Sequence, residues 1–256
     1  AEKKDANSPS VDQIVSRANI AAYYQGEDGK STVHMSISSE NGSERTRQFN
    51  ILRKDIEDGG NQNYYVYFYR PADVRGMVYM VHKHAAMDED DDRWLYMPAL
   101  DLVKRVAASD KRTSFVGSDY LYEDVSGRPL EADAHELTEE TKQFYIIKNV
   151  PKRPDAVKFS YYNVHIDKEN WLPMKMEYFD EDGKLYRTIE SLEVQEIEAE
   201  KDGETVVYPT VVKSVVKDLS RKSTTVMEFS GIEYNIGTGD IFTERYLRRP
   251  PREARR

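Results

Sequence analysis

The chain has 256 residues, no cysteine and a net charge of −9 at pH 7. These values exclude disulfide bonds and thiol chemistry, and they argue against nucleic acid as a partner, because phosphate binding requires a basic surface. Hydrophobic residues make up 39% of the chain, which is enough for a core, and no apolar run reaches the roughly 18 residues of a membrane-spanning helix.

The first predicted element is an amphipathic helix over residues 10–25. Ser10 and Gln13 have the spacing of a capping box. Aliphatic side chains and alanines then recur with a helical period. Gly26 stands where a helix C-cap is common, so we expect the helix to end just before it.

From about residue 32 onward the apolar period changes to two, which predicts strands. Val33, Met35 and Ile37 alternate with polar residues, and the following Asn41-Gly42 is a strong hairpin signal. Further strands are predicted at about 44–53, 63–70, 76–84, 93–98, 103–108, 142–149, 156–167, 173–180, 184–198, 204–218 and 221–230. Eleven or twelve strands in hairpin order make a mainly β protein with an open antiparallel sheet that must curl or close. Long helical patterns are missing between the strands, so a parallel α/β fold is not expected.

Two segments interrupt the meander. Residues 109–141 contain a short helix-like piece around 114–124, followed by a polar, acid-rich stretch. Near the end, residues 242–247 are expected to form one helical turn. We find no internal repeat and no low-complexity linker, so the chain is expected to be a single domain over 1–256.

Both ends of the chain are polar, and we expect residues 1–9 and 248–256 to be flexible tails. The chain starts at Ala1 rather than at methionine, and charged residues follow. We interpret this start as the one left after removal of a signal peptide, which predicts a secreted protein; the alternative is a start point chosen for protein production.

No motif in the sequence supports a catalytic or metal site. The acidic run Asp88–Asp92 begins like an EF-hand loop, but the required glycine and final glutamate are absent. His82 and His84 lie two apart on a predicted strand and lack further ligands. Gly237-Thr238-Gly239 lacks the rest of a dinucleotide motif. We therefore predict no catalytic residues, no metal and no cofactor, and the alternative is a hydrolase with dispersed residues.

Several fragments, spread along the chain in a fixed order, carry a family resemblance. They are Pro71-Ala72-Asp73-Val74-Arg75-Gly76, Arg93-Trp94-Leu95-Tyr96-Met97-Pro98-Ala99-Leu100, Ser114-Phe115-Val116-Gly117-Ser118-Asp119-Tyr120, Trp171-Leu172-Pro173-Met174-Lys175 and Asp240-Ile241-Phe242-Thr243. In this order they resemble bacterial outer membrane lipoprotein-sorting-like proteins of the LolA/LolB-type superfamily. The resemblance extends from the first helix to about Leu247.

The resemblance implies a fold, a location and a function. The fold is an open antiparallel half-barrel of about 11 strands, with the N-terminal helix and short helices covering its apolar concave face. The implied function is that of a periplasmic carrier or binding protein for lipid or lipoprotein acyl chains, serving outer-membrane lipoprotein sorting or a lipid exporter. The alternative is a periplasmic interaction module that partners an inner-membrane transporter without lipid transfer. Neither is an enzyme or an integral membrane protein.

The resemblance also implies a ligand site. In the lipoprotein carriers an arginine before a proline near the third strand helps to close the lid, and Tyr69-Arg70-Pro71 stands in the matching place here. Arg70 would donate to lid carbonyls or to ester oxygens of the ligand, and the alternative is an arginine at a strand end that faces water. The predicted ligand-binding residues are Val33, Met35, Ile37, Tyr67, Tyr69, Arg70, Met80, Trp94, Tyr96 and Phe115. Strand alternation leaves open which face lines the cavity.

Overall fold

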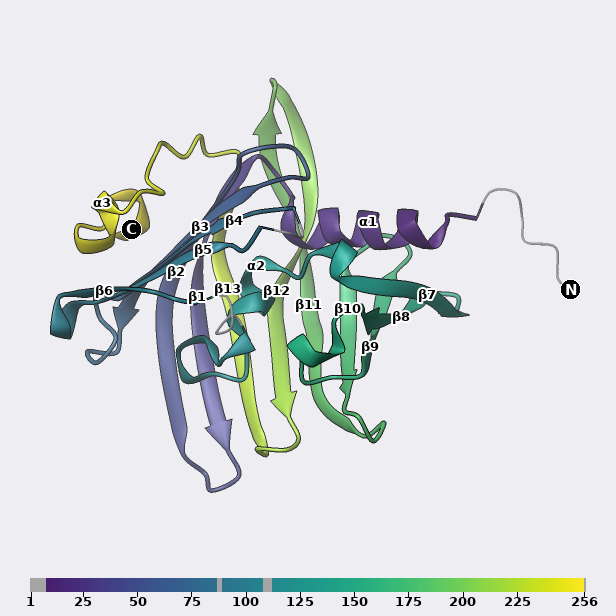
Figure 1. Cartoon of the computed structure of the whole chain (residues 1–256). Coiled ribbons are helices and arrows are strands. Elements are labelled where there is room, and N and C mark those ends of the chain that lie inside the picture. Colours follow the sequence, from purple (N-terminus) through teal and green to yellow (C-terminus); the bar gives the residue numbers. More distant parts are fainter. Residues whose placement is uncertain (1–7, 87–88, 108–111, 256) are drawn as a thin grey trace, which may run out of the picture.

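The computed structural model describes residues 8–86, 89–107 and 112–255. Its main feature is a 13-stranded antiparallel sheet, which curls but does not close into a barrel (Figure 1). The strands are β1 (Asp28–Ser39), β2 (Glu44–Asp55), β3 (Gln62–Arg70), β4 (Val78–Lys83), β5 (Asp92–Met97), β6 (Leu102–Arg105), β7 (Asp133–Glu140), β8 (Phe144–Pro151), β9 (Tyr161–Asp167), β10 (Pro173–Phe179), β11 (Leu185–Lys201), β12 (Glu204–Asp218) and β13 (Ser223–Tyr234). The helices are α1 (Val11–Tyr23), η1 (Pro98–Leu100), η3 (Phe115–Gly117), α2 (Tyr122–Ser126), η4 (Leu130–Ala132), η5 (Pro154–Ala156), α3 (Arg245–Arg248) and η6 (Glu253–Arg255).

The strand order determines where the long connection must run. The sheet has the order β6-β5-β4-β3-β2-β1-β13-β12-β11-β10-β9-β8-β7, so two meanders are joined where β1 pairs with β13. Strands β6 and β7 are consecutive along the chain but form the two opposite edges of the sheet. The chain between them therefore has to cross a whole face. It does so on the concave side, and we call the described residues 112–132 the crossing segment (Figure 1).

Helix α1 forms as its sequence predicts. The Ser10 side chain accepts from the backbone of Gln13, and the Gln13 side chain accepts from the backbone of Ser10, which completes the capping box. The helix ends at Tyr23, and Gly26 follows with a φ of +67°, a conformation that glycine adopts without strain. The buried face of α1 packs on β7, β8 and η4, so the helix covers one end of the concave face.

The acid-rich stretch of the predicted interruption contains a strand that the sequence did not suggest. Strand β7 pairs with β8 over residues 133–140 and forms an edge of the sheet. Most of its residues are exposed, and Glu136, Glu139 and Glu140 give it the charges that protect an edge strand from further pairing. Those charges weaken the apolar alternation that reveals a strand, which is why the sequence predicts fewer strands than the structure has.

The C-terminal residues differ from the expected flexible tail. Residues 241–255 pack on the convex face, where Ile241, Phe242, Leu247 and Ala254 are buried against β2 to β5. The Asn50 side chain on β2 donates to the carbonyl oxygen of Ala254 at 2.9 Å. The described part of the tail is therefore a second covering layer, on the side opposite to α1. The predicted N-terminal tail lies mostly outside the described residues.

Candidate functional site

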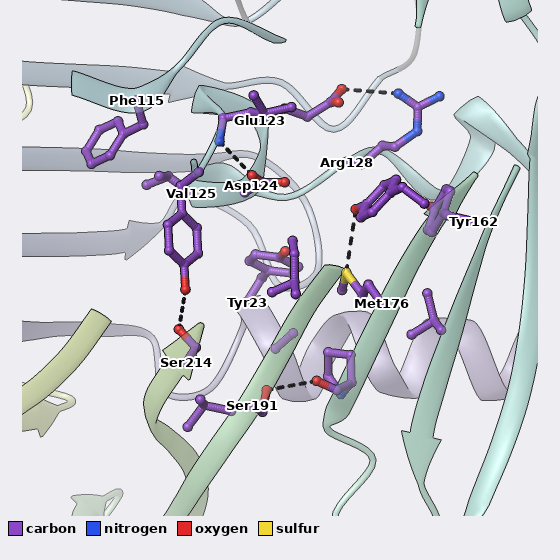
Figure 2. Close-up of a pocket in the computed structure, with 18 of the residues that line it drawn as sticks. Tyr23, Phe115, Glu123, Asp124, Val125, Arg128, Tyr162, Met176, Ser191 and Ser214 are labelled. Atoms are coloured by element: carbon purple, nitrogen blue, oxygen red, sulfur yellow. Dashed lines mark hydrogen bonds and ion pairs between the residues drawn. The ribbon is translucent and has the colours of Figure 1, made fainter. Parts of the chain in front are cut away.

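A cavity of about 1180 Å³ lies between α1, the crossing segment and the concave face of the sheet (Figure 2). Its apolar wall comes mainly from the second meander. Strand pairing places Ile147 opposite Val164, Val164 opposite Met176, and Met176 opposite Ile189. Because directly opposite residues share a face, these four side chains form a continuous band that lines the cavity.

Helix α1 leaves space where it faces this band. It lines the cavity with Val15, Ala18 and Ala22, which lie three and four residues apart and so occupy one side of the helix. The short alanine side chains leave the space between the helix and the sheet unfilled. Small residues on this side of α1 and larger ones on the sheet therefore leave a space between the two.

The crossing segment is held on the sheet by a buried ionic cluster. Arg187 on β11 donates to the backbone oxygen of Asp119 at 3.1 Å and forms an ion pair with Asp124. The Asp119 side chain accepts from Thr225 on β13 at 2.7 Å and from Arg221 at 2.9 Å. Burial acts to lower the pKa of Arg187, but the Asp124 carboxylate raises it, and the result lies above the usual value. Arg187 is therefore charged and paired.

A second polar cluster closes another side of the cavity (Figure 2). Arg128 donates to both carboxylate oxygens of Asp133, at 2.8 and 2.9 Å, and to Glu123 at 3.2 Å. The hydroxyl of Tyr162 donates to Asp133 at 2.8 Å. Burial, with the Asp133 charge, raises the pKa of Tyr162 well above its usual value, so the hydroxyl keeps its proton. The charges in this cluster are satisfied by one another, which leaves the cavity suited to an apolar ligand.

Arg53 joins the end of α1 to the sheet. This β2 arginine donates to the backbone oxygens of Tyr23, Gln25 and Gly26, and it forms an ion pair with Asp55 at 3.5 Å. Cations near a helix C-terminus satisfy carbonyls that have no partner within the helix. No pattern in the sequence indicates this role, because Arg53 is one of several charged residues near the end of its strand.

Lys83 lies on the same face and next to the same helix end. Its ammonium group sits over the rings of Tyr23 and Tyr24, at 5.4 and 5.5 Å from their centres. Burial lowers the pKa of Lys83 from 10.5 to about 8, although Asp91 and Asp55 act in the opposite direction. The buried ammonium therefore carries a penalty at neutral pH that disappears when it loses its proton.

This lowered pKa predicts a pH dependence of stability. The folded-state pKa lies below that of the unfolded chain, so between about pH 8 and 10.5 the unfolded chain binds more protons and stability rises with pH. Relative to a Lys83→Met variant, the free energy of unfolding of the wild type should increase by roughly 2–3 kcal/mol over that range. Urea unfolding of both proteins at several pH values measures this difference, and tyrosine ionisation cancels in the comparison. A difference that stays constant would contradict the buried ammonium.

The structure divides the predicted ligand-binding residues between two faces. Phe115 lines the cavity. Val33, Met35 and Ile37 are buried on the concave face, in the core that Phe115 completes, but they do not border the cavity. Tyr67, Met80, Trp94 and Tyr96 pack in the convex cluster beneath the C-terminal residues. Tyr69 is half-buried and borders no part of the cavity, and Arg70 is exposed at the end of its strand.

Within the described residues there is neither a cluster of metal-ligating side chains nor a membrane-spanning helix. No group of three or more metal-ligating side chains gathers there. Asp88 of the acidic run lies outside the described part, while the ring of His82 packs edge-on against Trp94 and His84 faces Glu89 and Asp92. No helix among residues 8–86, 89–107 and 112–255 is long and apolar enough to cross a membrane.

Comparisons place the chain in a family. A family model described as that of an uncharacterized protein matches residues 60–249. The chain belongs to this family. No curated protein matches it.

The fold is of the LolA type, as the resemblance predicted. A DUF1329 family protein from Desulfovibrio piger is similar with 28% identity and a TM-score of 0.80, over 91% of this chain and 96% of that one. An outer membrane lipoprotein-sorting protein domain from Vibrio parahaemolyticus has 23% identity and a TM-score of 0.78, over 92% and 97% of the two chains. A LolA superfamily protein from Nitrosomonas europaea has 17% identity and a TM-score of 0.66, over 93% and 100%.

Proposed function

We propose that this protein is a periplasmic carrier or binding protein that holds lipid or lipoprotein acyl chains in the cavity beneath α1 and the crossing segment. The observation that carries the proposal is the cavity itself, which is about 1180 Å³ in volume, has aliphatic and methionine side chains on its sheet side, and has Arg128 and Arg187 of its lining paired with carboxylates. Cavities of this character take up apolar ligands rather than water. The LolA-type fold, shared with a lipoprotein-sorting domain, supports the same function.

The expected affinity follows from the area that a ligand buries. A fatty chain of about a dozen methylenes gains on the order of 10 kcal/mol on leaving water, at roughly 0.8 kcal/mol per methylene. Ordering of the ligand and of its cover offsets much of this gain. The net result is binding at about micromolar or tighter concentration.

The two covers have different roles in this proposal. The crossing segment is fixed by the buried ion pair of Asp124 with Arg187 on β11 and by the hydrogen bond that Asp119 accepts from Thr225 on β13, so we treat it as the fixed side of the cavity. Helix α1 presents alanines to the cavity, and Arg53 holds its C-terminal end. We therefore assign the movement that admits a ligand to α1. The carrier would pass its ligand to or from the proteins of outer-membrane lipoprotein sorting, or to or from a lipid exporter of the inner membrane.

Filling the cavity from the helix tests the proposal. An Ala22→Trp variant places an indole ring where the acyl chain would lie, and we expect uptake of a fluorescent fatty-acid probe to fall at least about tenfold, since most of the buried methylene contacts are lost. The matched control is Ile20→Trp, on the same helix but 50% exposed and outside the cavity. It should take up the probe like the wild type. Circular dichroism of both variants checks that the helix is retained.

A direct measurement complements this pair. Protein purified gently from cells, then extracted with organic solvent, should release lipid detectable by mass spectrometry. If the wild type carries no lipid and takes up no acyl probe, the carrier function fails, and an interaction module becomes the better account.

A further inference from the structure

The tip of the β5–β6 hairpin exposes two leucines to solvent. Leu100, at the end of η1, is 70% exposed, and Leu102, at the start of β6, is 45% exposed. Between them Asp101 has a φ of +44°, a left-handed conformation that aspartate tolerates. The backbone turns at Asp101, so Leu100 and Leu102 both lie at the tip of the hairpin. Single exposed leucines are ordinary, but two at one projecting turn form an apolar point of contact.

Basic side chains surround this tip. Arg248 on α3 donates to the Asp101 carboxylate at 3.0 Å, which brings the C-terminal arginines beside the hairpin and neutralises the carboxylate between the leucines. The exposed basic residues of the two elements and their flanks are Lys104, Arg105, Arg245, Arg248 and Arg249. Arg105 pairs with Asp92 on β5, and only Asp101 and Glu244 oppose the other basic residues within residues 98–105 and 244–249. Figure 1 shows β6 and α3 at the same end of the molecule, away from α1.

The positive end contrasts with the rest of the protein. The chain as a whole carries a net charge of −9. Six acidic residues between Glu193 and Glu204 lie on the β11–β12 hairpin, which projects at the top of Figure 1. Net repulsion would keep such a protein from an anionic surface unless it approached by its positive end. The charge distribution therefore selects one orientation, with the leucines facing the surface.

We propose that the leucine tip, formed by residues 98–105 with α3 beside it, docks on a membrane surface that contains anionic lipid headgroups. The arginines and Lys104 attract the headgroups, and Leu100 and Leu102 enter the boundary between headgroups and acyl chains. Basic residues and a few apolar ones act together in this way at membrane interfaces. The proposal does not rest on the lipid cavity, because neither leucine lines it.

The proposal is tested by sedimentation of the full chain with vesicles. We expect the wild type to bind vesicles of phosphatidylethanolamine and phosphatidylglycerol, and to bind phosphatidylcholine vesicles much less. Binding should weaken between about 0.1 M and 0.5 M salt, because screening shortens the range of the charges. A Leu100→Asp, Leu102→Asp double variant should lose at least about tenfold in bound fraction. Reversal of charge in an Arg245→Glu, Arg249→Glu variant should abolish the preference for anionic vesicles.

A matched control distinguishes docking by the leucine tip from non-specific adsorption to vesicles. Leu192 is 51% exposed on β11 and precedes Glu193, and a Leu192→Asp variant should bind vesicles like the wild type. The double leucine variant should also take up the acyl probe normally, so loss of docking and loss of ligand uptake are distinguishable. Equal binding of the wild type to both kinds of vesicle, or equal loss in the Leu192→Asp variant and the double leucine variant, would overturn the proposal. So would undiminished binding by the double leucine variant.

Discussion

Replacement of Arg187 by alanine is expected to lower the free energy of unfolding by about 3–5 kcal/mol, because it leaves a carboxylate without its buried partner. Arg187 is buried, pairs with Asp124 and donates twice to the backbone oxygen of Asp119. Its guanidinium also lies 5.1 Å from the ring centre of Tyr178. One side chain thus holds the crossing segment on β11. Urea unfolding followed by circular dichroism measures the loss.

Two further variants identify the cause of that loss. Arg221 reaches the same Asp119 carboxylate but is 52% exposed, so Arg221→Ala should cost only about 1 kcal/mol or less. An Arg187→Met, Asp124→Leu double variant removes both charges and keeps apolar volume, and it should regain most of the stability. If Arg187→Ala costs no more than Arg221→Ala, the crossing segment is not held as we describe.

The parts of the fold that could be predicted from sequence are those encoded over short distances. The capping box at Ser10 and the hairpin signal at Asn41-Gly42 each involve a few neighbouring residues. The alternation around Val33 correctly predicted a strand whose apolar residues face the core. In each case backbone geometry and side-chain period act within one element, so no knowledge of its neighbours is needed.

The site could not be predicted in the same way. When both faces of a strand are apolar, its sequence does not show which face borders the cavity. Both sides of β3 and β4 are apolar: Tyr64 and Val66 belong to the concave core, while Tyr65 and Met80 belong to the convex cluster. Both sets are buried because the C-terminal residues cover the convex side. That cover comes from a segment about 170 residues further along the chain, which local patterns cannot place.

The choice of arginine shows the same limit. Arg70 precedes a proline, as the resemblance suggested, yet it lies exposed at the strand end. The bonds to backbone carbonyls are made by Arg53, which is nearer the end of α1. Which arginine reaches the helix depends on the register of β2 against β1 and β3, and so on the assembled sheet. The resemblance implied that an arginine donates to backbone carbonyls of the covering segment, and the assembled fold determines which arginine does so.

Replacement of Phe115 by alanine should cost about 3–5 kcal/mol of stability, because the ring is fully buried and its removal leaves a void. Its ring centre lies 5.9 Å from that of Phe49, 6.0 Å from that of Phe68 and 5.9 Å from that of Tyr79. These contacts join the crossing segment to the first meander, as Arg187 joins it to the second. Urea unfolding measures the loss of stability. An m-value equal to that of the wild type would show that the folded and unfolded states are otherwise unchanged.

The Phe115 variant also tests how the two halves of the sheet are coupled to the cavity. Phe115 lines the cavity, so its loss enlarges the space, and the folded variant should admit a bulkier acyl probe than the wild type does. Phe144→Ala is the matched control, since Phe144 is half-buried on β8 and lies outside the cavity. It should cost about 1 kcal/mol and leave the selectivity for probes unchanged. An equal cost for the two variants would show that the ring of Phe115 does not hold the crossing segment. Unchanged selectivity with a large loss of stability would mean that the cover closes over the void, so that the ligand space is set by α1 and the second meander alone.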